Sequence, residues 1–148
     1  MIDTHCHLAF PDLHNQVEDV LERAKSKGVR AAITVSTSAE DAQKGLELTH
    51  QFQQVWCTSG IHPHQAEGPH DWETIKRVAS DPKCVAWGEL GLDWYYSKPP
   101  REAQFKCLGS HLDLIESSRD TGLEMPIVVH CRESLGDLLE VLEKRDLP

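Results

Sequence analysis

The sequence has no excess of positive charge, no paired cysteines and no long apolar run. Its net charge is −9 over 148 residues, so charge alone does not create a surface for a nucleic-acid backbone. The five cysteines include no C-x-x-C pair, which argues against a disulfide framework and predicts a reducing compartment. No apolar stretch reaches the ~18–20 residues that cross a bilayer, and no secretory signal pattern is visible. These absences predict an acidic, soluble, cytoplasmic protein with no membrane partner.

Strand-like and helix-like patterns alternate along the whole chain. Short apolar, β-branched stretches predict strands, at residues 1–8, 31–36, 55–61, 84–90 and 125–131. Apolar residues at helical spacing predict helices, at residues 13–27, 38–52, 71–80, 100–119 and 134–144. Five successive βα units predict an α/β fold in which helices cover a parallel sheet, and we expect residues 1–148 to form a single domain.

Two parallel architectures fit this alternation, an open doubly wound sheet and a closed barrel. A doubly wound nucleotide-binding fold carries a glycine-rich loop after its first strand, but residues 7–11 read HLAFP and contain no glycine. Polar residues also end several strands, as at the mouth of a TIM barrel. The pattern therefore favours the barrel. Because a (β/α)₈ barrel takes about 250 residues, we expect an incomplete TIM-type barrel whose open sheet edges promote self-association.

Histidines and a glutamate lie at the ends of these strands. In the segment 3–7, DTHCH, a strand would place His5 and His7 on the same face. Two imidazoles on one face suit a divalent metal, although this short pattern also fits two hydrogen-bonded histidines in a barrel floor. Glu89 ends an apolar strand, where an inward carboxylate needs a partner or a metal. With His130 at the end of the last strand, these residues predict a metal site.

Two further histidines follow the third strand, in the segment 60–64, GIHPH. Pro63 favours an extended conformation at His62, so His62 and His64 would share a face and contact a substrate phosphate or a metal-bound water. The alternative is a polar loop with incidental histidines. The other histidines fall on predicted helices or loops, and we expect them to be solvated: His14, His50, His70 and His111.

Two arginines are candidates for binding phosphate oxygens. Arg132 shares a strand face with His130 and offers a planar fork, but a surface salt bridge with a neighbouring carboxylate fits equally well. Arg101 begins a predicted helix, whose N-terminus can hold a phosphate together with the arginine. Tyr95 and Tyr96 precede that helix and could either stack on a base or pack as loop aromatics.

The motifs together resemble the TatD-like metal-dependent deoxyribonucleases, a family of amidohydrolase-like TIM barrels. The resemblance covers the whole chain and rests on five motifs in order: DTHCHL at 3–8, GIHPH at 60–64, GELGLDWYY at 88–96, Arg101 with Gln104, and PIVVHCR at 126–132. The GELGLD block makes the combination specific. The resemblance implies that this chain corresponds to the N-terminal portion of the family barrel.

The resemblance also implies roles and cofactors. His5 and His7 look like ligands of a first metal, Glu89 like a catalytic carboxylate that bridges two metals, and His130 like a ligand of the second. The complete site would hold two divalent ions, with zinc, manganese or magnesium as candidates, and would hydrolyse DNA phosphodiester bonds by activating water. The family completes its site with a further histidine and an aspartate from later strands. This sequence contains neither motif, so we expect an incomplete site.

Two other functions remain open at this point. Another hydrolase of the same superfamily would cleave a lactone, an amide or a small phosphoester. Alternatively, the chain is a non-catalytic module that binds a metal or a partner through its open edges. A substrate screen with metals added would separate the first alternative from a deoxyribonuclease, and the number of metals bound per chain would identify the second.

Overall fold

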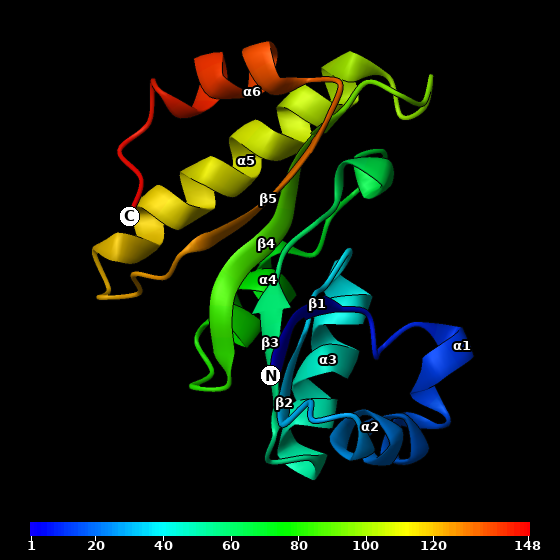
Figure 1. The fold of residues 1–148 in the computed structure, drawn as a ribbon. Helices are drawn as coiled ribbons and strands as arrows, with labels where there is room; N and C mark the ends of the chain where they lie inside the picture. The colour runs from blue at the N-terminus through cyan, green and yellow to red at the C-terminus, as the bar shows by residue number, and fades with distance from the viewer.

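A computed structural model describes residues 1–148, and its five strands form a parallel sheet curved into a half-barrel (Figure 1). The strands are β1 (Ile2–Cys6), β2 (Ala31–Thr34), β3 (Val55–Ser59), β4 (Cys84–Asp93) and β5 (Ile127–Arg132). The helices are α1 (Pro11–His14), α2 (Val17–Ser26), α3 (Ala39–Gln51), the 3₁₀ turn η1 (Pro63–Gln65), α4 (Trp72–Ala79), α5 (Arg101–Arg119) and α6 (Leu135–Leu142). The predicted α/β class and the incomplete TIM-type barrel are confirmed.

The order of strands in the sheet is the order in the chain, β1-β2-β3-β4-β5, and every neighbouring pair is parallel. Figure 1 shows α2 and α3 beside β1 to β3, and α5 and α6 beside β4 and β5. Parallel neighbours require such crossover helices. All five carboxyl ends therefore meet at one rim of the sheet, where the polar strand-end residues lie.

Local sequence signals account for most of the helix boundaries. The Ser38 side chain accepts a hydrogen bond from the Asp41 backbone N–H, and Asp71 does the same for Thr74, so both are N-caps. One predicted helix is wrong: residues 13–27 do not form one helix but divide between α1 and α2. Pro11 starts α1 two residues earlier, and the non-helical backbone at Gln16 separates the two helices.

The core lies under the middle of the sheet and leaves both edges open. β3 and β4 are almost entirely buried, whereas β1 and β5 are largely exposed. The main apolar cluster centres on Trp87, Leu90 and Leu92 of β4, with the apolar face of α5 packed against them. A smaller cluster joins α2 to the β1–β2 side. The sheet therefore has a buried centre and two edge strands, each of which lacks a neighbouring strand on one side.

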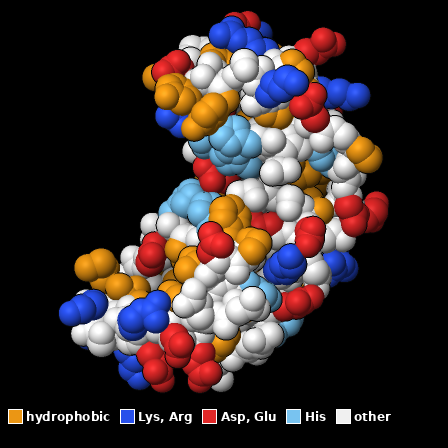
Figure 2. Space-filling model, turned by 90° about the vertical axis from the view of Figure 1, so that its right-hand side faces the viewer, with side chains coloured by type: hydrophobic (Ala, Val, Ile, Leu, Met, Phe, Trp, Pro, Cys, Tyr) orange, Lys and Arg blue, Asp and Glu red, His pale blue; other side chains and the backbone are white.

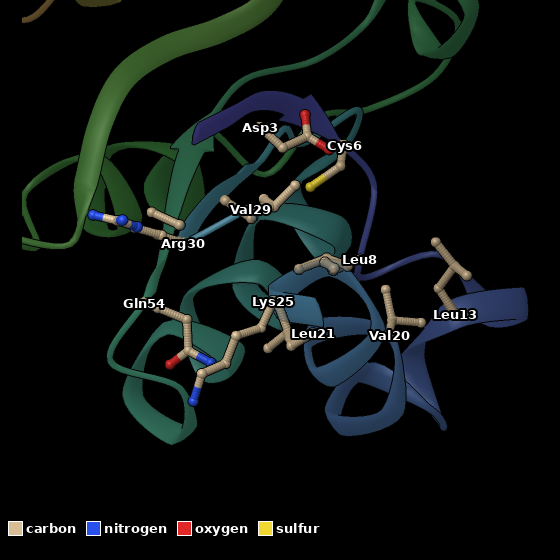
Figure 3. A pocket seen from close by; sticks show the side chains of 13 residues that line it. Asp3, Cys6, Leu8, Leu13, Val20, Leu21, Lys25, Val29, Arg30 and Gln54 are labelled. Carbon is tan, nitrogen blue, oxygen red and sulfur yellow. The ribbon is translucent and has the colours of Figure 1, made fainter. Parts of the chain in front are cut away.

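An apolar pocket of about 530 Å³ lies on the β1–β2 side of the sheet (Figure 3). Leu21 of α2, Leu8 and Cys6 line it, so it opens between this helix and the first strand. It contains none of the histidines or glutamates that the sequence singles out. No helix of the protein is both long enough and apolar enough to cross a membrane.

Candidate metal centre

Histidine side chains gather around a hollow in one face of the molecule (Figure 2). A pocket of about 300 Å³ lies there, at the carboxyl ends of the strands. Its polar lining brings together residues from β1, β3, β4 and β5 and the segments that follow them: His7, His62, His64, Glu89, Asp93 and His130. The structure thus places side chains from four separate βα units around one cavity.

Glu89 reaches this cavity because the chain bulges at its position. Between β4 and β5, Gly88 pairs with Val128 and Leu90 with Val129, so Glu89 is an extra residue on β4. A bulge of this kind re-aims a side chain. The Glu89 backbone N–H donates to the Ser36 carbonyl at 3.1 Å, while Leu90 and Leu92 enter the core. The carboxylate is therefore turned to the pocket although the strand around it is apolar.

The backbone beside Glu89 has room only for glycine. A Cβ on Gly60, at the end of β3, would lie 2.4 Å from the Gly88 Cα, and Gly88 itself has a φ of +121°. Residues that carry a side chain rarely adopt that backbone conformation. These glycines let the ends of β3 and β4 approach closely beneath the site.

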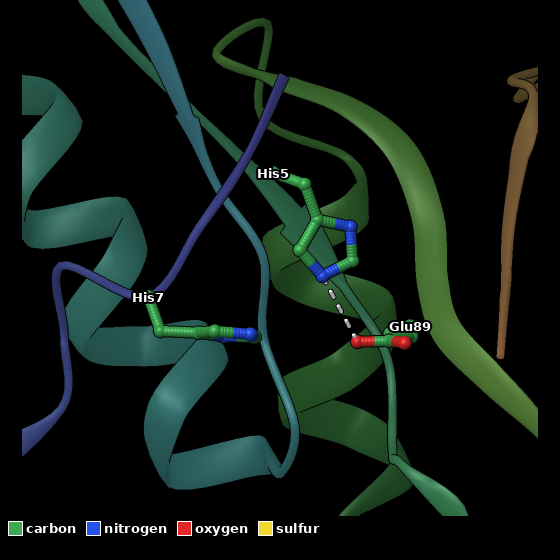
Figure 4. Close-up of side chains that lie close together, drawn as sticks. All are labelled: His5, His7 and Glu89. Atoms are coloured by element: carbon green, nitrogen blue, oxygen red, sulfur yellow. Dashed lines mark ion pairs between the residues drawn. The ribbon is translucent and has the colours of Figure 1, made fainter. Parts of the chain in front are cut away.

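Glu89 directs its two carboxylate oxygens to different histidines. Its Oε2 lies 3.3 Å from His5 Nε2, and its Oε1 lies 3.1 Å from His130 Nδ1. Figure 4 shows His5 and His7 of the first strand segment pointing toward Glu89. Donor atoms of His5, His7 and Glu89 all lie within 4.8 Å of one another, and so do those of His62, Glu89 and His130. Glu89 is the one residue common to both groups.

Hydrogen bonds on the far side of two rings turn the other ring nitrogen toward the pocket. His7 Nδ1 lies 2.9 Å from the Val35 carbonyl, which only accepts, so Nδ1 carries the proton and Nε2 is free. His130 Nε2 lies 3.0 Å from Asp93 Oδ2, and this N–H donates to the carboxylate. His130 Nδ1 then faces Glu89. Carbonyl or carboxylate partners of this kind orient metal-binding histidines.

His62, unlike His7, has its unprotonated nitrogen turned away from the pocket. Its Nδ1 accepts a hydrogen bond from the His64 backbone N–H at 3.0 Å, so the proton of a neutral ring is on Nε2. Nε2 lies 3.0 Å from His130 Nδ1. Burial, together with the charge of His130, lowers the pKa of His62 to about 4. His62 is therefore a neutral N–H donor that faces the cavity, although it lies close enough to complete the second donor group.

The charges of the site stabilise its two carboxylates. Burial raises the pKa of Glu89, but the hydrogen bond to His130 and the charges of His62 and His5 outweigh it and leave the pKa below its ordinary value. Burial likewise opposes ionisation of Asp93, yet hydrogen bonds from His130, from the Tyr95 backbone and from His64 lower its pKa. The hydrogen bond to Glu89 raises the pKa of His130.

The donor chemistry fits a transition-type divalent cation. Imidazole nitrogens and a carboxylate are typical ligands of zinc and are also suited to manganese or iron. His7 Nε2 and His130 Nδ1 face the site, Glu89 presents an oxygen to each side, and polar groups hold the rings from behind. His5, His7, Glu89 and His130 converge as the sequence predicts, and their metal binding stays a prediction.

Two predicted substrate contacts differ in their surroundings. Arg132 lines the pocket, and its guanidinium carbon lies 3.7 Å from the Tyr95 ring centroid. None of the protein's ion pairs includes Arg132, so the surface salt-bridge alternative is not what the structure shows. Arg101 lies outside the pocket lining, with its guanidinium 4.5 Å over the Trp94 ring. The position of Arg101 gives its predicted substrate role no support.

Two residues have structural roles that the sequence reading missed. Asp93 belongs to β4, which runs three residues beyond the predicted strand, and it holds both His64 and His130. The prediction that His111 is solvated is wrong, because the side chain is fully buried. Its neighbours on α5, including Leu108, Leu112 and Ile115, are buried at helical spacing. That periodicity was the available signal. Of the other histidines expected to be solvated, His50 is exposed, and His14 and His70 are half-buried.

Comparison with known proteins identifies the family. A family model described as TatD related DNase matches residues 2–148, and the chain belongs to this family. It is 31% identical over 147 residues to the "Uncharacterized metal-dependent hydrolase YcfH" of Escherichia coli K12, covering 97% of this chain and 54% of that protein. It is 28% identical over 145 residues to the "3'-5' ssDNA/RNA exonuclease TatD" of Salmonella typhimurium, with coverages of 97% and 54%.

The fold matches a solved relative. The crystal structure of YjjV, a TatD homologue from Escherichia coli K12, superimposes with a TM-score of 0.87 at 32% identity, covering 100% of this chain and 57% of that one. The chain thus spans about half the length of the relatives it matches.

Proposed function

We propose that this chain carries the metal-binding part of a metal-dependent hydrolase that cleaves phosphodiester bonds of DNA. The observation that carries the proposal is the position of Glu89, whose two oxygens face His5 on one side and His130 on the other. A carboxylate shared by two histidine groups is suited to two neighbouring cations. Family membership and the exonuclease name of the Salmonella relative support a nucleic-acid substrate.

In this proposal, His5, His7 and Glu89 hold one ion, and Glu89 and His130 hold the other. Two divalent ions, when bound, lower the pKa of a water and stabilise charge on the attacking and leaving oxygens. Zinc and manganese suit the histidine-rich donor set, and magnesium remains a candidate because it binds phosphate oxygens as well. Catalysis through Glu89 follows from its position between the two groups.

The remaining residues act on the substrate. His62 presents its Nε2–H to the cavity and donates a hydrogen bond to a phosphate oxygen or to a water. Arg132 offers its planar fork at the rim of the pocket. Asp93 fixes the orientation of His130 and of His64. Arg132 and the proposed metal ions provide local positive potential, which a protein of net charge −9 needs in order to bind a polyanion.

A second candidate, a partner-completed or non-catalytic module, is favoured by the open sheet edges. β1 and β5 are the two ends of the sheet, and Ile2, Val129 and Leu135 are exposed on or beside them. Unpaired edge strands promote pairing with another chain. Self-association therefore stays a prediction, to be tested by sedimentation velocity. Hydrolysis of a lactone, an amide or a small phosphoester, and a cytoplasmic location, also stay predictions from the sequence.

The decisive experiment compares metal binding with phosphodiester hydrolysis. Manganese is titrated calorimetrically into the metal-free protein, and a labelled single-stranded DNA is incubated with the manganese-loaded protein. Glu89→Gln should lower manganese affinity by more than about 100-fold, above the range for outer-shell changes, and should abolish any turnover. Glu73→Gln, an exposed carboxylate on α4, is the matched control and should change neither quantity.

A third variant separates the roles of the histidines. His62→Ala should bind manganese within about threefold of the wild type, because its free nitrogen is turned away from the site, yet should lose about 10²-fold or more in turnover as a donor near the reacting groups. Unchanged manganese binding in Glu89→Gln would overturn the proposed metal site. Binding of two ions without hydrolysis of DNA would instead favour another substrate or the non-catalytic module.

A further inference from the structure

Exposed aromatic side chains are concentrated at the mouth of the metal-site pocket. Of the four exposed aromatic residues, Phe10, Tyr95 and Tyr96 lie on the pocket lining or in contact with it, and only Phe105 lies elsewhere. Single exposed apolar residues are ordinary on protein surfaces. Three exposed aromatic rings around one polar cavity of about 300 Å³, however, are more than scattered single residues, and they call for an explanation in terms of that cavity.

Phe10 and Tyr96 each have one face or edge fixed by a histidine of the site. The Phe10 ring stacks on His7, with ring centroids 4.6 Å apart and an interplanar angle of 19°. The Tyr96 ring meets His64 edge-on at 5.1 Å. Phe10 follows β1 and Tyr96 follows β4, so the two rings reach the pocket from different loops. Phe10 is 39% and Tyr96 49% exposed, although Tyr96 also meets the Tyr95 ring with centroids 4.8 Å apart.

Tyr95 has a different role, because the Arg132 side chain covers it. The guanidinium carbon lies 3.7 Å from the Tyr95 ring centroid and 5.2 Å from that of Tyr96. Stacking of this kind fixes the plane of an arginine and leaves its N–H groups available. The fork is thereby set beside Tyr96, whose side chain is about half exposed, at the same rim of the pocket.

We propose that Phe10 and Tyr96 are stacking surfaces for the bases of single-stranded nucleic acid, with Arg132 held by Tyr95 for the phosphate between or beside those bases. The inference rests on the proposed function and names the part of the substrate that the metal ligands do not contact. Unpaired bases stack on aromatic side chains irrespective of their sequence. A base-paired duplex hides its base faces, so this subsite selects single strands and frayed ends.

The test measures binding in EDTA, where hydrolysis does not occur and metal ligation plays no part. Fluorescein-labelled decathymidylate is compared by anisotropy with a decamer of the same charge whose nucleotides are abasic. The wild-type chain should bind decathymidylate about tenfold more tightly, in the range for one or two stacked bases. Phe10→Leu and Tyr96→Leu should each reduce this preference several-fold, and the double variant should remove it.

Two controls separate stacking from structural damage. Tyr96→Phe keeps the aromatic face and should retain the preference, whereas Tyr96→Leu should not. Phe105→Leu alters an exposed aromatic residue outside the pocket, whose ring lies tilted against that of Trp94, and should leave the preference unchanged. A trinucleotide containing 2-aminopurine should also lose fluorescence on binding the wild type and regain it with Tyr96→Leu.

The outcomes distinguish this inference from the proposed function. Equal affinity of the wild type for the two decamers, or no measurable affinity for either, would overturn the stacking subsite. A preference that survives in the double variant would do the same. Failure of metal-dependent hydrolysis would overturn the proposed function, and it would be seen in a separate assay that contains manganese.

Discussion

The two halves of the candidate site are built differently. On one side, His5 lies on an edge strand with nearly half of its side chain exposed, and its partner within the site is Glu89. On the other side, His130 is held between Glu89 and the fully buried Asp93. His5 is thus open and held by few contacts, whereas His130 is braced from behind. The two ions of the proposed function are therefore expected to bind with unequal affinity.

The largest expected effect comes from removing one ligand from each half in turn. His130→Ala should lower the affinity of the tighter manganese ion by more than about 100-fold, above the range for outer-shell changes. His5→Ala should leave the tighter ion in place and remove the weaker one. Calorimetric titration with manganese measures both affinities and the number of ions. The comparison fails if His5→Ala is the variant that loses the tighter ion.

A smaller effect is expected from changing Asp93, which holds His130 from behind. Asp93→Asn keeps the size of the side chain but removes the negative charge that holds the protonated Nε2 of His130. Loss of such a partner lowers metal affinity by about 10–100-fold, and the loss should be confined to the ion on the His130 side. Asp81→Asn, whose carboxylate pairs with the exposed His50, is the matched control. Equal weakening of both ions would contradict the division into an open and a braced half.

The buried His111 has no carboxylate partner, unlike His5 and His130, and the smallest expected effect concerns its protonation. Burial, and to a lesser extent the charge of His70, lowers the pKa of His111 to about 3. Because this value lies below the ordinary one near 6.5, the unfolded chain takes up the proton first, and stability falls as the pH drops below about 6.5. Between pH 7 and pH 5 this one group should lower the free energy of unfolding by about 2 kcal/mol.

His111→Leu should flatten that pH dependence, as measured by urea unfolding at several pH values. His50→Gln, on the surface, should leave the slope as it is. A leucine variant that loses stability with acid as steeply as the wild type would show that other groups carry the effect.

The sequence predicted the general plan of the molecule well. Regular alternation of βα patterns indicated the parallel half-barrel, and Ser38 and Asp71 marked helix starts that the structure confirms. His5, His7 and His130 lie at one rim because the strands are parallel, which follows from the topology alone, whereas Glu89 joins them through the bulge in β4. Motifs at strand ends were thus enough to indicate where a site would form.

The details that depend on contacts between distant segments were not visible in the sequence. The tautomer of His62 is set by the backbone N–H of His64, and the orientation of His130 by Asp93, thirty-seven residues away. The bulge at Glu89 depends on the pairing of β4 with β5. Periodicity cannot report such contacts, since they exist only after the strands have paired.

The agreement between strand order and chain order has a consequence for biosynthesis. Each strand pairs with the one made just before it. The two strands of every pair are therefore separated in the chain only by the connection between them. Low separation between contacting segments favours rapid folding, and chains fold from the N-terminus as the ribosome releases them. His5 and His7 are therefore made before the segment that carries Glu89, and the proposed metal site can form only after β4 has joined the sheet.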